Sequence, residues 1–262
     1  MKKLFILTTT LLSILFAAGQ QELFVPTAAS RGLHGPVRVV QTVKYYDWEQ
    51  DAYPYTSSEA YTKDGFLMYD TYVSYVGTEE LTFYQKDEQN RLTDILFSGN
   101  LHGDHYIYAD DGRLQYIVTD HIDERMPKDT LFVTAYDAQG RTLELSKEGK
   151  PKYRYSYRAD GSLFSAEYIN SWTIYYNPQG QEDSTRTYYD FTEYRYNENG
   201  DLIMETKHYR DTGEPTIMDP GTTTIRRYNY NEERDRYGNW LSIDIEKDGL
   251  IHHIVRHIIY YE

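Results

Sequence analysis

Apolar and polar side chains alternate with a period of two along much of the chain, which is the pattern of β-strands with one face turned to a core. The clearest example places Tyr153, Tyr155 and Tyr157 on one face and charged or polar residues on the other. After the N-terminal segment, no stretch sustains the 3.6-residue apolar period of an amphipathic helix. Three further segments are expected to be strands, namely residues 35–46 (the first), 224–230 and 251–261 (the last).

A short motif, Tyr followed four residues later by Gly, recurs along the chain. In the middle of the sequence its copies lie about 20 residues apart, a length that suits two strands and two turns. In a degenerate copy that begins at Tyr84, Asn90 takes the place of Gly. We therefore predict an all-β fold, an antiparallel meander of repeated β-hairpins with about 14 to 18 strands in a curled or extended sheet. The copies span residues 61–65, 108–112, 136–140, 157–161, 176–180, 196–200 and 209–213.

Asp-Gly and Asn-Gly pairs mark the expected turns. Such pairs favour type I′ turns, because both central residues of that turn need a positive φ. We therefore expect type I′ hairpins at each pair, and a long loop where Pro and Gly gather in residues 210–223. The five pairs are at 64–65, 111–112, 160–161, 199–200 and 248–249.

The N-terminus has the features of a secretory signal peptide. Lys2 and Lys3 precede an apolar run that is too short to span a bilayer, and small residues precede a cleavage point after Gly19. We expect residues 1–19 to be removed, 20–34 to be a flexible leader and 35–262 to be a single repeat domain. The chain has no Cys, so it is not expected to be a lipoprotein or to hold disulfides. The expected location is the periplasm or the cell exterior, without membrane insertion after cleavage.

The amino-acid composition limits which ligands are expected and indicates what forms the core. The formal charge of −14 makes nucleic acid an unexpected ligand, because phosphate backbones are bound by basic surfaces. The chain also holds 29 Tyr, and each ring can bury a large apolar area if its hydroxyl finds a partner. We expect most of the repeat Tyr residues to form the core between hairpins.

The spacing Tyr-x-x-x-Gly-x-Leu resembles the YD repeats of the bacterial RHS family, with a weaker likeness to MORN-type repeats. The stretch 235–241, Asp-Arg-Tyr-Gly-Asn-Trp-Leu, is similar to a copy found near the end of small exported YD-repeat proteins. The resemblance implies strand-turn-strand units, and a loose link to carbohydrate binding and cell-surface contact, but no catalytic residue. This chain is too short for the toxin-enclosing shell of large RHS proteins. The best copies lie at 108–114, 136–141, 157–163 and 196–202.

No motif predicts catalysis. His102, Asp104 and His105 offer metal-ligating groups, but they lie at an expected turn and lack the spacing of a helical zinc site. Carboxylates are abundant, yet no pair is selected by a motif, and no nucleophile elbow or phosphate loop occurs. We therefore predict no enzyme activity and no cofactor.

The aromatic residues are the functional candidates. Exposed Trp and Tyr rings suit both sugar stacking and protein contacts. We predict a non-catalytic binding or scaffold protein of the cell envelope with a protein partner. The alternatives are binding of a cell-surface glycan, and an immunity or chaperone role beside a secreted toxin. The ligand-binding candidates are Trp48, Trp172, Trp240, Tyr153 and Tyr155.

Overall fold

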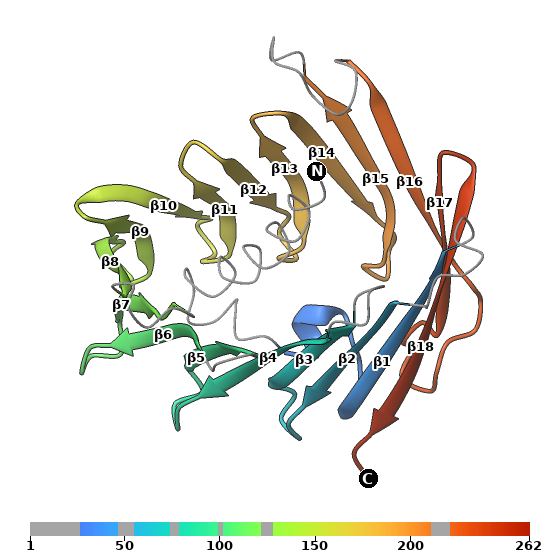
Figure 1. Ribbon diagram of the computed structural model, residues 1–262, viewed down its shortest axis with the longest axis horizontal. Coiled ribbons are helices and arrows are strands. Elements are labelled where there is room, and N and C mark those ends of the chain that lie inside the picture. The colour runs from blue at the N-terminus through green and yellow to red at the C-terminus, as the bar shows by residue number, and fades with distance from the viewer. Residues whose placement is uncertain (1–26, 47–54, 74–78, 99–101, 122–127, 211–220) are drawn as a thin grey trace. The chain divides into compact units, whose positions relative to one another are not determined.

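The computed structural model describes most of the chain after residue 26 (Figure 1). The contacts within the chain divide it into two units. Unit 1 comprises residues 81–169, and unit 2 comprises residues 27–80 and 170–262. Both are built of antiparallel strands, which confirms the prediction of an all-β fold of repeated hairpins. The described residues are 27–46, 55–73, 79–98, 102–121, 128–210 and 221–262.

In unit 1 each strand pairs with the next one along the chain. The first of these strands begins two residues before the unit does. The strands are β4 (Glu79–Lys86), β5 (Leu92–Phe97), β6 (His102–Tyr108), β7 (Leu114–Thr119), β8 (Asp129–Tyr136), β9 (Thr142–Lys147), β10 (Lys150–Tyr157) and β11 (Leu163–Tyr168).

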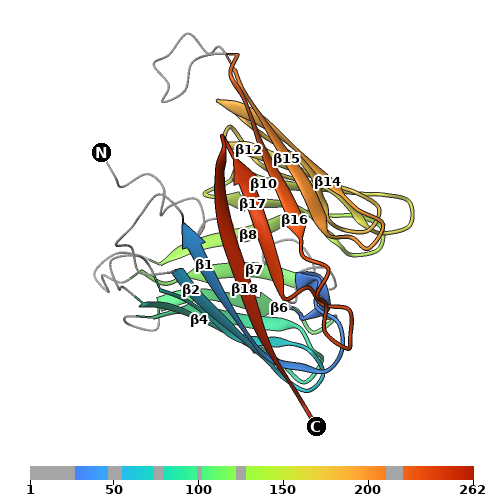
Figure 2. The same ribbon diagram turned by 90° about the vertical axis from the view of Figure 1, so that its right-hand side faces the viewer.

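Unit 2 joins the two ends of the repeat region. Its strands pair in the order β12 to β18, then β1, β2 and β3, so that β1 lies between β18 and β2 (Figure 2). The strands are β12 (Trp172–Tyr176), β13 (Glu182–Thr187), β14 (Asp190–Tyr196), β15 (Leu202–Tyr209), β16 (Thr223–Tyr230), β17 (Ser242–Lys247), β18 (Leu250–Tyr260), β1 (Val37–Tyr46), β2 (Tyr55–Tyr61) and β3 (Leu67–Val73).

Most of the turns differ from the type I′ prediction. At Gly112 only the glycine has a positive φ, of 87°, and the turn closes with the Gly112 N–H donating to Ala109 O and the Ala109 N–H donating to Arg113 O. The register shifts next to Tyr108, which identifies a type I turn followed by a bulge with Gly in the left-handed conformation. Gly65, Gly161 and Gly200 likewise have a positive φ without a positive φ at the preceding residue. Among the five pairs, only Asp248-Gly249 has positive φ at both residues.

This turn explains the spacing of the repeat. Tyr ends one strand, three turn residues follow, and the αL position that comes next favours Gly because a Cβ is strained there. Asn90, the predicted substitute for Gly, has a φ of 63° and is one of the few non-Gly residues in this conformation.

The motif Tyr residues tie successive hairpins together. Four of the seven motif Tyr residues, and Tyr230 on β16, donate the hydroxyl hydrogen to the carbonyl oxygen of the residue two positions after the turn Gly, or Asn90, of an earlier hairpin. In unit 1 a guanidinium from that earlier turn also covers the ring, as Arg141 covers Tyr157 at 4.2 Å. The repeat Tyr residues therefore serve the structure, through both ring and hydroxyl. The pairs are Tyr108 with Leu92, Tyr136 with Leu114, Tyr157 with Thr142, Tyr196 with Glu182, and Tyr230 with Leu202.

The described part of the expected leader, residues 27–34, belongs to unit 2. Residues 29–31 form the short 3-10 helix η1 (Ala29–Arg31), and Ala28 and Leu33 on either side of it are buried. Apolar side chains thus hold this segment, a feature that its small and polar composition did not indicate. The loop expected at 210–223 lies largely outside the described residues.

Candidate functional site

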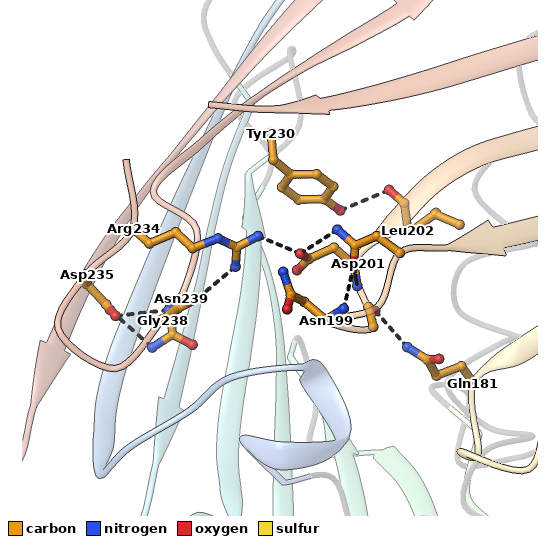
Figure 3. A network of polar contacts seen from close by, with 11 residues as sticks. Gln181, Asn199, Asp201, Leu202, Tyr230, Arg234, Asp235, Gly238 and Asn239 are labelled. Carbon is orange, nitrogen blue, oxygen red and sulfur yellow. Dashed lines mark hydrogen bonds and ion pairs between the residues drawn. The ribbon is translucent and has the colours of Figure 1, made fainter. Parts of the chain in front are cut away.

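A polar network connects the turns at one edge of unit 2 (Figure 3). Arg234 donates to a carboxylate oxygen of Asp201 at 2.5 Å and to Gly238 O at 2.7 Å. Gln181 donates to Gly200 O at 2.7 Å, so that each turn is bonded to the next. These contacts are local to the repeat and hold its turns in register.

Asn239, in the copy that ends the repeat, anchors the N-terminal segment. Its side-chain oxygen accepts the His34 N–H at 2.7 Å, and its amide donates to His34 O at 2.9 Å. Only 2% of Asn239 is exposed, and its amide also contacts the Tyr260 hydroxyl at 2.8 Å. The role of this Asn is therefore to join the beginning of the repeat region to its end.

Two cationic side chains lie on one face of β1 and β18. In the register of these strands Thr42 pairs with Arg256 and Lys44 pairs with Ile254, which makes Lys44 and Arg256 diagonal neighbours. The Arg256 guanidinium lies 3.5 Å from the centroid of the Trp240 ring. Burial lowers the pKa of both side chains, and their mutual repulsion lowers the pKa of Lys44 further.

The other face of β1 and β18 carries an apolar stripe, which we define as Val39, Val43, Tyr45, Ile251, Val255 and Ile259. The register places Val39 opposite Ile259 and Val43 opposite Val255, and strand alternation puts all six side chains on one side. The polar pair Gln41 and His257 lies between these two apolar pairs on the same face, and His253 lies opposite Tyr45. Tyr45, Ile251 and Ile259 are 47%, 48% and 56% exposed. Large apolar side chains therefore face solvent on neighbouring strands.

Unit 1 has a buried polar row on β6. His102, Asp104 and Tyr106 point to the same side of the strand, and each has a buried polar atom without a hydrogen-bond partner: Nδ1, Oδ2 and the hydroxyl. The other carboxylate oxygen of Asp104 accepts from Thr119 at 2.6 Å. Burial raises the Asp104 pKa to about 6, although the Thr119 hydrogen bond opposes this shift.

His105 points to the opposite side of β6 and bridges two carboxylates. Its Nδ1 lies 2.7 Å from Asp94 and its Nε2 lies 3.2 Å from Asp120. Partial burial lowers the His105 pKa, but the hydrogen bonds and charges of the two carboxylates outweigh it, so the pKa is raised. The His-Gly-Asp-His segment is thus divided between two faces, and no group of three His, Asp or Glu among the described residues is arranged to hold a metal ion.

The aromatic residues selected from the sequence do not form one site. Tyr153 and Tyr155, on β10, are only 8% and 4% exposed, so their rings belong to the interior of unit 1. Trp172 begins β12 and is half-buried, while Trp240 lies between Arg256 and Tyr230. Trp48 lies outside the described residues.

The sequence pattern did not indicate the surfaces that strand pairing assembles. The alternation of Val39, Val43 and Tyr45 was visible, but only the pairing with β18 shows that Ile251 and Ile259 extend it. Tyr188 and Tyr189, 54% and 48% exposed at the turn between β13 and β14, had no signal beyond their residue type.

Comparison with known proteins finds similar solved structures at low sequence identity. No protein-family model and no curated protein matches it. It is similar to a chain of the TcdB2-TccC3-Cdc42 crystal structure, with 15% identity over 74% of this chain and 11% of that chain and a TM-score of 0.33. A chain of TcdB2-TccC3-TEV gives 11% identity, 80% and 16% coverage, and a TM-score of 0.31.

A third similar structure is a porin-like protein from Bacteroides uniformis, with 11% identity over 86% of this chain and 99% of that chain and a TM-score of 0.39. The chain spans 11% and 16% of the lengths of the two TcdB2-TccC3 chains. Within the described residues, no helix has the length and apolar character needed to span a membrane. The class defined by the chain's own residues is an all-β protein of repeated antiparallel hairpins.

Proposed function

We propose that the protein is an exported, non-catalytic binding protein of the bacterial cell envelope, and that the apolar stripe of β1 and β18 docks a protein partner. The observation that carries this proposal is the exposure of Tyr45, Ile251 and Ile259 on adjacent strands of one face. Exposed apolar side chains that gather on one surface are typical of protein contact sites. The signal peptide expected at residues 1–19 supports export.

The flanks of the stripe indicate the chemistry of the partner. On the β2 side, Thr56 and Ser58 pair with β1, and such short side chains leave the apolar side chains prominent. On the β17 side, Asp244 and Glu246 pair with β18. A partner with an apolar centre and a basic rim would complement this surface, in keeping with the net charge of −14.

The test is a substitution inside the stripe compared with one outside it. Ile259→Asp is expected to abolish capture of a stoichiometric envelope protein, because it places a charge at the most exposed apolar position of the stripe. Ile203→Asp on β15 is the matched control, since Ile203 is 38% exposed but lies away from the stripe. Binding of the purified partner should follow the same pattern. Equal binding by both variants would overturn the proposal, and so would a wild-type dimer that Ile259→Asp dissociates.

Carbohydrate binding is the second candidate, and one observation favours it. Tyr188 and Tyr189 are exposed at a turn and pack edge to face, with ring centroids 5.1 Å apart. Such rings can stack on a sugar. A glycan array with clear hits that are lost on joint replacement of Tyr188 and Tyr189 by Ala, but kept in Tyr157→Phe, would select this function. An array without hits would exclude carbohydrate binding as the function.

A further inference from the structure

We propose that unit 2 binds a small oxyanion between Lys44 and Arg256, on the face of β1 and β18 opposite the apolar stripe. The chemical class is phosphate, sulfate or carboxylate. The proposal is independent of the protein partner, because it uses the other side of the same two strands.

The fold forces the two cations together. Lys44 and Arg256 are diagonal neighbours on paired strands, so their Cβ atoms are about 7–8 Å apart or less, within reach of one small ion for side chains of this length. Both side chains are largely buried, and the pKa of each is lowered by that burial. Holding two like charges in a partly desolvated place is unfavourable unless an opposite charge joins them.

The nearby carboxylates are engaged elsewhere. Glu59 accepts the Tyr61 hydroxyl at 2.6 Å, and Asp201 is paired with Arg234 at 2.5 Å. Among the described residues, no carboxylate lies within 4.0 Å of the charged nitrogens of Lys44 or Arg256. The Arg256 Nε is buried and makes no hydrogen bond. The charges of Glu59 and Asp201 oppose the lowering of the Arg256 pKa from a distance, but neither carboxylate contacts Lys44 or Arg256 directly, which leaves room for an anion between the two cations.

The guanidinium is already fixed for binding. Stacking on Trp240 at 3.5 Å holds its plane, and the Tyr230 ring supports Trp240 edge to face, with centroids 5.7 Å apart. A planar guanidinium presents N–H donors in a fork that matches two oxygens of an oxyanion, while the Lys44 ammonium supplies a point charge. Because the Arg256 plane is held, little rotamer entropy would be lost on binding.

The test measures thermal stability and heat of binding of the mature chain with inorganic phosphate, and with sulfate and acetate in separate arms. Sodium chloride at equal ionic strength corrects for screening. At a phosphate concentration of about 100 times Kd, the wild-type folding equilibrium constant should rise about a hundredfold. Lys44→Gln should weaken phosphate binding at least about tenfold, because the anion loses a desolvated charge partner. The arm with the tightest binding identifies the group recognised.

Arg227→Gln is the control, because this outward-facing Arg on β16 has a side chain that is 52% exposed and should leave binding unchanged. Since Arg256 also packs on Trp240, Arg256→Lys is used beside Lys44→Gln to retain the charge but lose the fork. Two results would overturn the proposal: no oxyanion effect on the wild type beyond that of sodium chloride, or an unchanged phosphate affinity in Lys44→Gln.

Discussion

The hydroxyl that links one hairpin to the next can be tested at Tyr157. Its hydroxyl donates to Thr142 O at 2.8 Å, while its ring lies under the Arg141 guanidinium. Tyr157→Phe removes one oxygen atom and keeps the ring, so the change isolates the hydrogen bond from the packing.

The magnitude follows from burial. Thr142 is 6% exposed, so its carbonyl oxygen would lose its phenolic donor in a place with little access to water. A hydrogen bond contributes about 0.5–1.5 kcal/mol, and an unsatisfied buried acceptor costs about 1–3 kcal/mol. We expect Tyr157→Phe to lower the free energy of unfolding of unit 1 by about 1–2 kcal/mol.

Urea denaturation and amide hydrogen exchange would measure the effect. With a slope of about 2 kcal/mol per M, the midpoint should fall by roughly 0.5–1 M. Exchange of the β9 and β10 amides should report the loss in unit 1 even if the two units unfold separately. The matched control is Tyr188→Phe, which removes the hydroxyl of a 54% exposed Tyr and should change stability little.

The reasoning would be refuted if Tyr157→Phe lost no more stability than Tyr188→Phe. It would also fail if the loss appeared only in the exchange of unit 2. Either result would mean that the hydroxyl is replaced by water without cost, and that the repeat Tyr is retained for its ring alone.

Three further predictions concern β6. The pKa of Asp104 is raised to about 6, so the folded state keeps a proton that the unfolded state loses, and the free energy of unfolding should fall as pH rises from about 4 to about 6. This fall amounts to at most about 3 kcal/mol. Urea titrations at several pH values should show that Asp104→Asn removes it. Because the pKa of His105 is raised in the folded state, protonated His105 stabilises the fold fully below pH 6.5, and this stabilisation is lost as pH rises through the higher folded-state pKa. His105→Gln should therefore flatten the dependence of the free energy of unfolding on pH in that range. Gly103→Ala should destabilise unit 1 by more than about 2 kcal/mol in the same assay, because its Cβ would lie 1.9 Å from Ile95 O.

Much of the fold could be predicted because its signals are local. The alternation at 224–230 lies within β16, and that at 251–261 overlaps nearly all of β18. The Tyr-to-Gly spacing indicates where strands end, since Gly112 and its equivalents take a conformation that other residues rarely adopt. The turn type was wrong because the type I′ expectation considered only the Asp-Gly or Asn-Gly pair, whereas the bulge beside Tyr108 depends on the partner strand.

The candidate sites could be predicted only in small part, because they depend on which side of a strand is buried. Tyr153 and Tyr155 were selected by residue type, yet the fold turns both rings inward. Lys44 and Arg256 carry no motif and become neighbours only through the pairing of β1 with β18. Such pairings join segments far apart in the sequence, and period-two alternation cannot reveal them.

The pairing of β1 with β18 can form only after nearly the whole chain has been synthesised. His34 and Asn239, which fasten the ends of the repeat region, are 205 residues apart. At a synthesis rate of about 5–20 residues per second, roughly 10–40 s pass between the synthesis of His34 and that of Asn239. During that interval the open edge of β1 and the valines beside it can pair with other chains. Shielding of this edge until β18 is made would therefore limit association between new chains.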